Sequence, residues 1–237
     1  KNARHRVVVT CHETSDNAAL LGDISQLADA VIVDTLPNRL ELILAGCDAA
    51  KIRVISPGVG RYSETSQRDV RERIGFPLTR KLIVSNGVVA PEAGILETIA
   101  AVSELGKDLD VGYLVVGSAQ PHVPESRNYL ERCKATVRRL RLEQHVFFLE
   151  NLSQHQLMDY MAAADAIVLF HQTGRYEWSN DAALALSAGR PVITSTDLGF
   201  MAFGDALLPR GDSSQLAGAL RSVLTNPLLA GELSRQA

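Results

Sequence analysis

Cysteine is scarce in this chain of 237 residues. The three cysteines, Cys11, Cys47 and Cys133, are odd in number and far apart, and neither they nor His122 and His171 have a metal-ligand spacing. Such a set favours a reduced intracellular protein over a disulfide framework. We therefore expect a cytoplasmic protein that uses no metal cofactor.

Long apolar runs are also lacking. No stretch approaches the roughly 18 to 20 residues that span a bilayer, and the first residues do not have the layout of a signal peptide. The chain begins at Lys1 rather than at Met, and almost at once it enters an apolar, strand-like run. These features predict a piece of a longer protein without a transmembrane segment.

Charge of one sign does not dominate either. The formal net charge is −3 and the basic residues are dispersed, which gives no general electrostatic reason to bind nucleic acid. One basic group, Lys134, Arg138, Arg139 and Arg141, stands near the end of an expected helix. Peripheral contact with a membrane or a phosphate is one interpretation, and a solvated helix face is the favoured alternative.

Three common catalytic fingerprints are missing from the sequence. It contains no phosphate-binding P-loop, no dinucleotide-binding G-x-G-x-x-G motif and no G-x-S-x-G nucleophile elbow. These absences argue against three large classes of α/β enzyme and leave other nucleotide-binding folds open.

The sequence does contain a regular alternation of strands and helices. Apolar runs at 6–11, 28–34 and 51–55 predict strands, and the segments 15–27 and 36–45 predict the helices between them. This βαβαβ pattern is typical of a parallel sheet covered by helices. The polar segment 56–80 follows, with one expected helix at 66–74, and is the candidate linker.

From Lys81 onward the alternation restarts and predicts a complete doubly wound domain. The expected strands lie at 82–85, 112–117, 146–149, 165–170, 192–194 and 206–208. The expected helices lie at 94–105, 127–142, 154–164, 182–188 and 213–224.

The stretch Glu177 to Ser195 is the most informative one. Ser179 or Asn180 can cap a short helix of Ala and Leu residues, and Gly189 with Pro191 ends it before a β-branched strand. A helix that begins at the carboxyl end of a parallel strand directs free N–H groups and a positive dipole end toward the ligand side. The unit therefore predicts an anion site, with a phosphate as its natural ligand.

The order of these features resembles the C-terminal half of GT-B glycosyltransferases of family 4, the group 1 type. The landmarks that carry the resemblance are the Ala-Asp-Ala strand at 28–33, Lys51–Val59, Leu114–Gly117, Val146–Leu149, Ala162–Ala166 and Ala185–Ile193. The resemblance implies a Rossmann-like acceptor-side remnant at 1–55, a hinge at 56–80 and a nucleotide-sugar domain at 81–237. It further implies a hexosyltransferase-like enzyme that transfers sugar from a nucleotide-diphosphate sugar with retention of configuration. The acceptor stays open between a saccharide, a lipid and a small molecule, and the fragment alone is expected to be inactive.

Several positions depart from the family's pattern. The family holds its diphosphate with an Arg and a Lys where this chain has Val88 and Ala93, and it has a ribose-binding Glu where this chain has Leu184. Each charge-assisted hydrogen bond contributes about 1.5–3 kcal/mol, so another group must compensate for these losses. Arg175 is the candidate substitute, and the alternative is an ordinary solvent-exposed loop charge. Asp181 suits the helix dipole but repels a phosphate docked there.

The remaining candidate site residues follow from the resemblance. His12 and Glu177 are the expected catalytic residues near the donor sugar, although a His at a strand end is often only a structural hydrogen bonder. The expected donor-binding residues are Asn86, Gly87, Glu150, Leu152, Arg175, Ser179, Asn180 and Asp181. A plain loop turn explains Asn86 and Gly87 equally well, and an ordinary loop carboxylate explains Glu150.

The leading hypothesis is therefore a glycosyltransferase with a variant donor site. The segment from Ser179 to Leu184 is similar to a variant of the family in which small residues begin this helix. This similarity favours an active subtype of the family over an inactive site. The rival is a catalytically degenerate GT-B protein that acts as a partner or scaffold. An isomerase or epimerase of the same architecture is a third hypothesis, and it rests on fold analogy alone.

Overall fold

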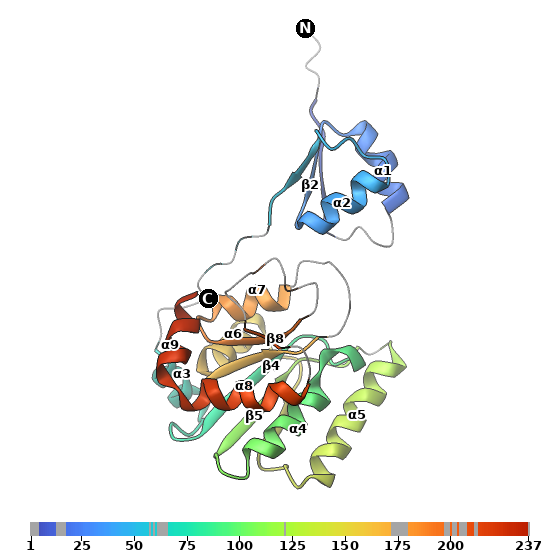
Figure 1. The fold of residues 1–237 in the computed structure, drawn as a ribbon. Coiled ribbons are helices and arrows are strands. Elements are labelled where there is room, and N and C mark those ends of the chain that lie inside the picture. The colour runs from blue at the N-terminus through green and yellow to red at the C-terminus, as the bar shows by residue number, and fades with distance from the viewer. Residues whose placement is uncertain are drawn as a thin grey trace. The chain divides into compact units, whose positions relative to one another are not determined.

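The computed structural model describes residues 5–12, 18–56, 58, 60, 66–120, 122–171, 180–196, 200, 203, 208–210 and 213–236. Described residues up to Gly58 belong to a smaller compact unit, and those from Gly60 onward belong to a larger one (Figure 1). Each unit contains its own parallel sheet. The predicted α/β class is thus present in both units.

The smaller unit is a three-stranded parallel sheet with two helices. Its strand order is β1-β2-β3, and residues Val9 and Val31 are partners in the register of β1 and β2. Its elements are β1 (Val8–Cys11), α1 (Ala18–Leu27), β2 (Ala30–Val33), α2 (Leu36–Leu44) and β3 (Ile52–Val54). Thr35 caps α2, because its hydroxyl accepts the Asn38 N–H at 3.3 Å, and Pro37 stands in the first turn, where no N–H donor is needed.

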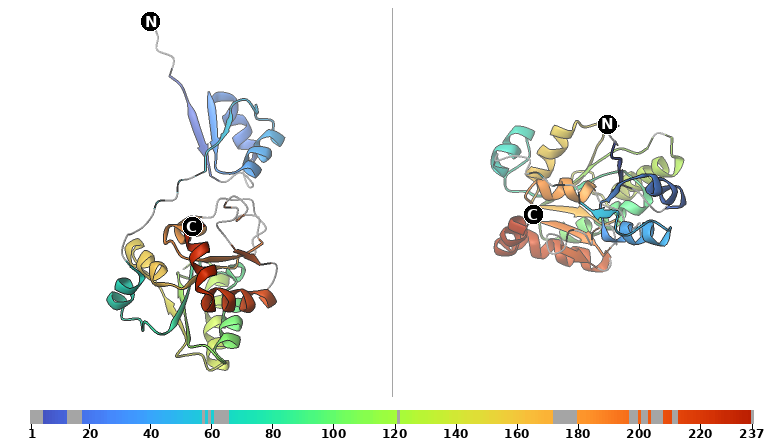
Figure 2. Two further views of the ribbon diagram at one scale, coloured as in Figure 1. Left: turned by 60° about the vertical axis from the view of Figure 1, so that its left-hand side comes forward. Right: turned by 90° about the horizontal axis from the view of Figure 1, so that it is seen from above.

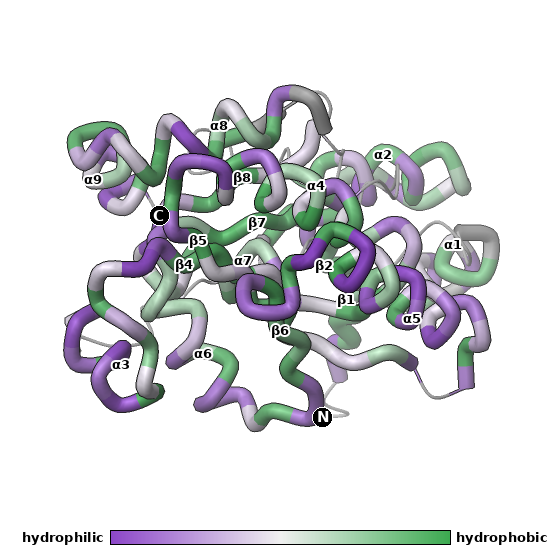
Figure 3. The backbone as a smooth tube through the Cα atoms, turned by 90° about the horizontal axis from the view of Figure 1, so that it is seen from below, coloured by the Kyte–Doolittle hydropathy of each residue, from purple (hydrophilic) through white to green (hydrophobic). Residues whose placement is uncertain are grey.

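The larger unit is organised around a six-stranded parallel sheet. Its strands are β4 (Lys81–Asn86), β5 (Val111–Val116), β6 (Val146–Leu149), β7 (Ala166–Leu169), β8 (Val192–Ser195) and β9 (Leu208–Arg210), in the order β6-β5-β4-β7-β8-β9. All residues of β5 and β7 are buried, because helices cover both faces of the sheet. In Figure 3 the central strands β7 and β8 are drawn mainly in the hydrophobic colour, whereas the helices contain residues of both kinds.

Helices form two layers on this sheet (Figures 1 and 2). One core cluster joins the sheet to α4 (Ile95–Leu105), α5 (Pro124–Arg139) and α8 (Ser213–Thr225), while α9 (Pro227–Gln236) follows α8 and adds Leu233 to it. The second cluster joins the sheet to α3 (Gln67–Ile74), α6 (Gln154–Ala163) and α7 (Asn180–Ser187). A short 3-10 turn, η1 (Pro91–Ala93), precedes α4.

The helix α3, which the sequence analysis assigned to the linker segment, is tightly bound to α6 and the sheet. The Arg71 guanidinium is buried, pairs with Asp165 at 2.6 Å and donates from Nε to the Ala163 carbonyl at 2.8 Å. Gln67 donates to the carbonyl of Ala164 at 2.7 Å. These contacts join α3 to the larger unit.

Some element boundaries differ from those predicted. Helix α5 begins at Pro124 rather than Arg127, because proline is well suited to the first helical position. Helix α9 was not predicted, although the Asn226 side chain accepts the N–H groups of Leu228 and Leu229 and caps it. Asn180 is the first residue of α7 rather than its cap.

Candidate functional site

The candidate site lies at the carboxyl edge of the larger sheet. From β4 the chain continues to β5 and β6 on one side, and from β7 it continues to β8 and β9 on the other. Strands β4 and β7 are therefore neighbours at the point where the strand order reverses. In open α/β sheets, ligands bind outside the carboxyl ends of the strands at such a switch point.

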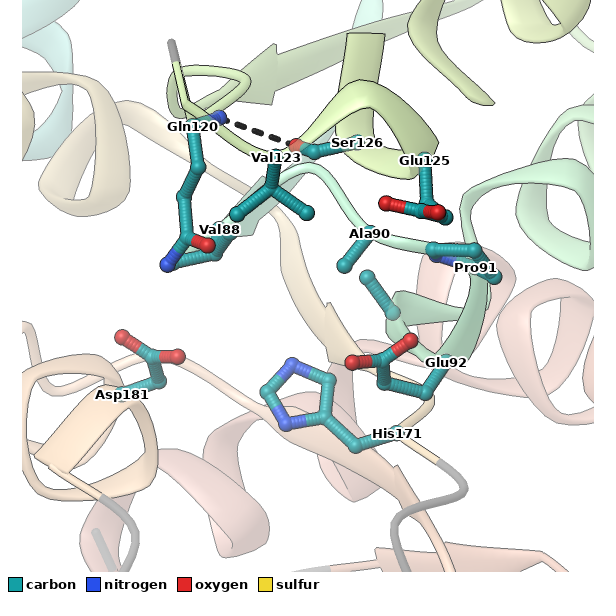
Figure 4. Close-up of a pocket in the computed structure, with 11 residues that line it drawn as sticks. Val88, Ala90, Pro91, Glu92, Gln120, Val123, Glu125, Ser126, His171 and Asp181 are labelled. Atoms are coloured by element: carbon teal, nitrogen blue, oxygen red, sulfur yellow. Dashed lines mark hydrogen bonds between the residues drawn. The ribbon is translucent and has the colours of Figure 1, made fainter. Parts of the chain in front are cut away.

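A cavity of about 490 Å³ opens at this edge. The loops after β4, β5 and β7 line it together with the starts of α5 and α7 (Figure 4). The lining residues are Val88, Ala90, Pro91, Glu92, Ala93, Gln120, Val123, Glu125, Ser126, His171 and Asp181.

Ser126 fixes two of these loops to each other. Its side chain is buried; the hydroxyl donates to the Val89 carbonyl and accepts the Gln120 N–H at 2.9 Å. The loop after β4 and the loop after β5 are thus joined through one side chain. This contact holds the upper wall of the cavity in Figure 4.

His171 lies at the end of β7 and is held from two sides. Its carbonyl accepts a hydrogen bond from the Ser195 hydroxyl, and its ring packs on Phe200 with the centroids 5.6 Å apart. In Figure 4 the imidazole lies between the carboxylates of Asp181 and Glu92. Among the described residues that line the cavity, His171 is the basic side chain that accompanies the three acidic ones.

Three of the predicted donor-binding residues meet at one point. Asn86 ends β4 and donates from Nδ2 to Asp181 Oδ1 at 3.3 Å. Gly87 has a φ of +121°, and a Cβ built there would lie 2.5 Å from Asp181 Oδ2. Asn86, Gly87 and Asp181 thus form one packed group, and Asn180 precedes Asp181 at the exposed start of α7.

Asp181 has an altered acidity in this position. Burial raises the pKa of its carboxyl group above the ordinary value, and this effect outweighs the opposing influences of the His171 charge and the Asn86 hydrogen bond. The carboxylate is thus costly to ionise where it lies.

Two further donor-binding candidates, Glu150 and Leu152, are not among the residues that line the cavity. They follow β6, where Glu150 lies 4.0 Å from the Lys134 ammonium group and Leu152 packs against the second core cluster. The contact with Lys134 is compatible with the alternative interpretation of Glu150 as an ordinary loop carboxylate.

His12 belongs to the smaller unit, where it follows β1. Its Nδ1 lies 2.8 Å from Oδ2 of the buried Asp34, while most of the ring is exposed. The carboxylate orients the imidazole, and this contact suits either a structural or a catalytic histidine. The candidates Glu177, Arg175 and Ser179 lie outside the described residues.

The cavity also contains residues that the sequence analysis did not propose. Glu92, Glu125, Gln120 and Ser126 line it, and each stands within about ten positions of the end of a predicted strand, which is the signal that could have identified them. Across the described ranges, no three His, Cys, Asp or Glu residues are grouped to hold a metal ion, and no helix is long and apolar enough to cross a bilayer.

Comparison with protein families decides the relationship. The family model for glycosyl transferases group 1 matches residues 66–237. The chain belongs to the group 1 glycosyl transferases. Comparison with curated proteins gives no significant match.

Several solved structures share the fold of this group 1 chain. Anabaena Alr3699/HepE in complex with UDP-glucose is 21% identical with a TM-score of 0.77, over 98% of this chain and 66% of that one. Sucrose-phosphate synthase from Thermosynechococcus elongatus is 21% identical with a TM-score of 0.75, over 99% and 62%. WaaG, a glycosyltransferase involved in lipopolysaccharide biosynthesis, is 17% identical with a TM-score of 0.73, over 98% and 72%.

These comparisons confirm the predicted GT-B fold. The chain spans 65–66% of the length of the Anabaena HepE chains that it matches. At these identities the similarity shows a shared fold, and the chemistry of the site has to be inferred from this chain's own residues.

In this group 1 chain, the described lining of the cavity is acidic. Val88 and Ala93, which stand where the family resemblance implies an Arg and a Lys, both line it. Among its described lining residues there are three carboxylates and a histidine, with no Lys or Arg. Leu184, at the implied ribose-binding position, is half-buried against the second core cluster.

Proposed function

We propose that this chain is part of a glycosyltransferase that moves a sugar from a nucleotide-diphosphate sugar to an acceptor, with retention of the anomeric configuration. The observation that carries the proposal is the 490 Å³ cavity at the β4–β7 switch point of a group 1 domain. Solved structures with the same fold contain UDP or UDP-glucose, which supports a nucleotide sugar as the donor.

In this proposal the donor contacts the loops at the carboxyl edge of the larger sheet. Asn86, Gly87 and the start of α7 at Asn180 would contact the diphosphate, with Arg175 as the substitute cation. The base would pack near Glu150 and Leu152, while His12 and Glu177 would act near the donor sugar. The protein would contribute orientation of the two substrates and stabilisation of the leaving diphosphate.

Calorimetric titration with UDP, GDP and dTDP tests the proposal. We expect one of them to bind the full chain, because a group 1 domain holds the nucleotide of its donor. The proposed transfer uses no metal ion, so EDTA should leave this affinity unchanged. Absence of binding by all three at about millimolar concentration, the weak end of ordinary affinities, would contradict a transferase.

The second candidate is a degenerate GT-B protein that acts as a partner or scaffold. The acidic lining of the cavity favours it, because Glu92, Glu125 and Asp181 repel a diphosphate. For this candidate all three nucleotides fail to bind, so the same titration separates it from the transferase.

For either candidate function, we also propose a cytoplasmic location. It is supported by the free, buried state of Cys11, Cys47 and Cys133, which is common in reducing compartments. Fractionation of cells that express the full-length protein would test it.

A further inference from the structure

The carboxylate of Asp181 occupies one face of the Gly87 backbone. A Cβ added to Gly87 would lie 2.5 Å from Oδ2 and 3.1 Å from Cγ of Asp181. Because glycine has no Cβ, another group can approach the backbone of Gly87 closely on this face. In this structure the group that approaches is a side chain of the same protein.

The other side of the same turn is closed by Gly117 at the end of β5. A Cβ on Gly117 would lie 1.9 Å from the Gly87 carbonyl oxygen, so the two main chains are in direct contact. A phosphate that approached the face of Gly87 where a Cβ would stand would therefore meet the Asp181 carboxylate.

The groups around Asp181 offset only part of the cost of ionising its buried carboxyl group. Asn86 of β4 is its hydrogen-bond donor within the described part of the chain, and His171 at the end of β7 lowers the cost of its ionisation. Glu92 from η1 and Glu125 from α5 line the same cavity and add negative charge. A diphosphate that entered would thus meet three carboxylates and one imidazole.

We propose that Asp181 is a specificity-determining residue that weakens the binding of a nucleotide diphosphate beside Gly87 while its carboxylate is ionised, and that binding becomes tighter when that charge is removed. This inference rests on the proposed function, because it concerns the donor site of the transferase. It assigns the repulsion of a diphosphate chiefly to one side chain rather than to the whole acidic lining.

The proposal has a definite pH dependence. Burial raises the pKa of Asp181, so its proton is lost at a higher pH than that of an exposed aspartate, and nucleotide affinity should rise as the pH falls through that pKa. The nucleotide itself also changes its charge over this range, and His171, Glu92 and Glu125 line the same cavity. The variant Asp181→Asn keeps His171, Glu92 and Glu125, so its own pH profile isolates the contribution of Asp181.

The test is calorimetric titration of the full chain and of Asp181→Asn with UDP, GDP and dTDP. We expect the variant to bind its preferred nucleotide at least about tenfold more tightly at pH 8, because like charges a few Å apart inside a protein repel strongly. The gain should shrink as the pH is lowered toward 5. The corresponding nucleoside, which lacks the diphosphate, should bind equally to both proteins.

Asp69→Asn is the matched control. Asp69 lies in the first turn of α3 as Asp181 lies in the first turn of α7, but it is exposed and absent from the cavity lining. The nucleotide affinity of Asp69→Asn should stay within about twofold of that of the parent. This result would separate a local effect of Asp181 from an effect of the net charge. Asp181→Ser serves as a second variant where Asp181→Asn folds poorly by circular dichroism.

The outcomes separate this inference from the proposed function. Binding by the parent that becomes tighter in Asp181→Asn supports both. Binding by Asp181→Asn alone supports the role of Asp181 and contradicts the transferase proposal for the parent chain. Binding by the parent that is unchanged or weaker in the variants overturns the role of Asp181 and leaves the transferase proposal intact. Absence of binding by every protein overturns both.

Discussion

At the scale of the residue, three glycines account for the close approach of the loops around the cavity. Gly87 and Gly117 are in main-chain contact, and Gly94, between η1 and α4, lies against the end of β7. A Cβ on Gly94 would lie 2.2 Å from the Phe170 carbonyl oxygen. Since His171 follows Phe170, this packing also fixes one wall of the cavity.

We predict that Gly94→Ala destabilises the larger unit by about 3 kcal/mol or more. The added methyl group meets a backbone carbonyl, and Gly94 has a φ of +66° that L-residues rarely adopt. Gly189→Ala is the control, because its φ of +62° is nearly the same and nothing lies within 4 Å of its Cβ. It should cost only about 1 kcal/mol. Urea denaturation measures both, and equal losses would show that backbone strain alone decides the effect.

At the scale of the element, helix α3 depends on a buried ion pair. Arg71 is 4% exposed and makes contacts with Asp165, Ala163 and the Arg80 carbonyl at 3.2 Å. Asp165 also accepts the Leu82 N–H at 2.7 Å, so it joins α3 to the start of β4. One arginine thus connects a helix, a neighbouring helix end and the central sheet.

We predict that Arg71→Met destabilises the larger unit by about 3–5 kcal/mol, because it removes the guanidinium that forms an ion pair with the largely buried Asp165 carboxylate. Arg68→Met on the same helix is the control. Arg68 pairs with Glu72 at 2.9 Å, but both side chains are more than half exposed, so the loss should stay below about 1 kcal/mol. Urea denaturation followed by circular dichroism measures both variants, and a small loss for Arg71→Met would exclude the ion pair as the main contact of α3.

The elements also show what the sequence could and could not predict. Apolar runs such as Val111–Val116 are buried on both faces, so they predicted the parallel sheet directly, while the GT-B resemblance came from landmark motifs such as Ala185–Ile193. The residues of the site could not be predicted in this way, because the loop side chains that come together are determined by the irregular backbone of the loops. Asn86, Gly87 and Asp181 do meet, whereas Glu92 and Glu125 enter the cavity from a short turn and a helix start that periodicity does not reveal. Helix α9 was missed because its signal is a single capping residue, Asn226, and not a long apolar pattern.

At the scale of the whole molecule, the two units differ greatly in core size. The buried apolar residues of the smaller unit are Cys11, Ala28, Val31, Val33, Leu42, Cys47 and Ile52. Its helix α2 carries Leu36, Leu40 and Leu44 with 66%, 57% and 87% of their surface exposed. The larger unit has one extensive core cluster on each face of its sheet. Small cores bury a smaller share of their surface and give marginal stability.

We predict that the chain unfolds in two transitions, with the smaller unit first, because each unit has a separate core and the smaller one buries less apolar surface. Leu42→Ala, in the smaller core, should lower only the first transition, and Ile99→Ala, in the larger core, should lower only the second. Both side chains are fully buried, so each substitution should cost about 2–5 kcal/mol in its own unit. Differential scanning calorimetry measures the two transitions, and hydrogen exchange assigns them, since amides of β1 to β3 should exchange before those of β4, β5 and β7. A single transition that shifts equally in both variants would mean that the two cores unfold as one cooperative body.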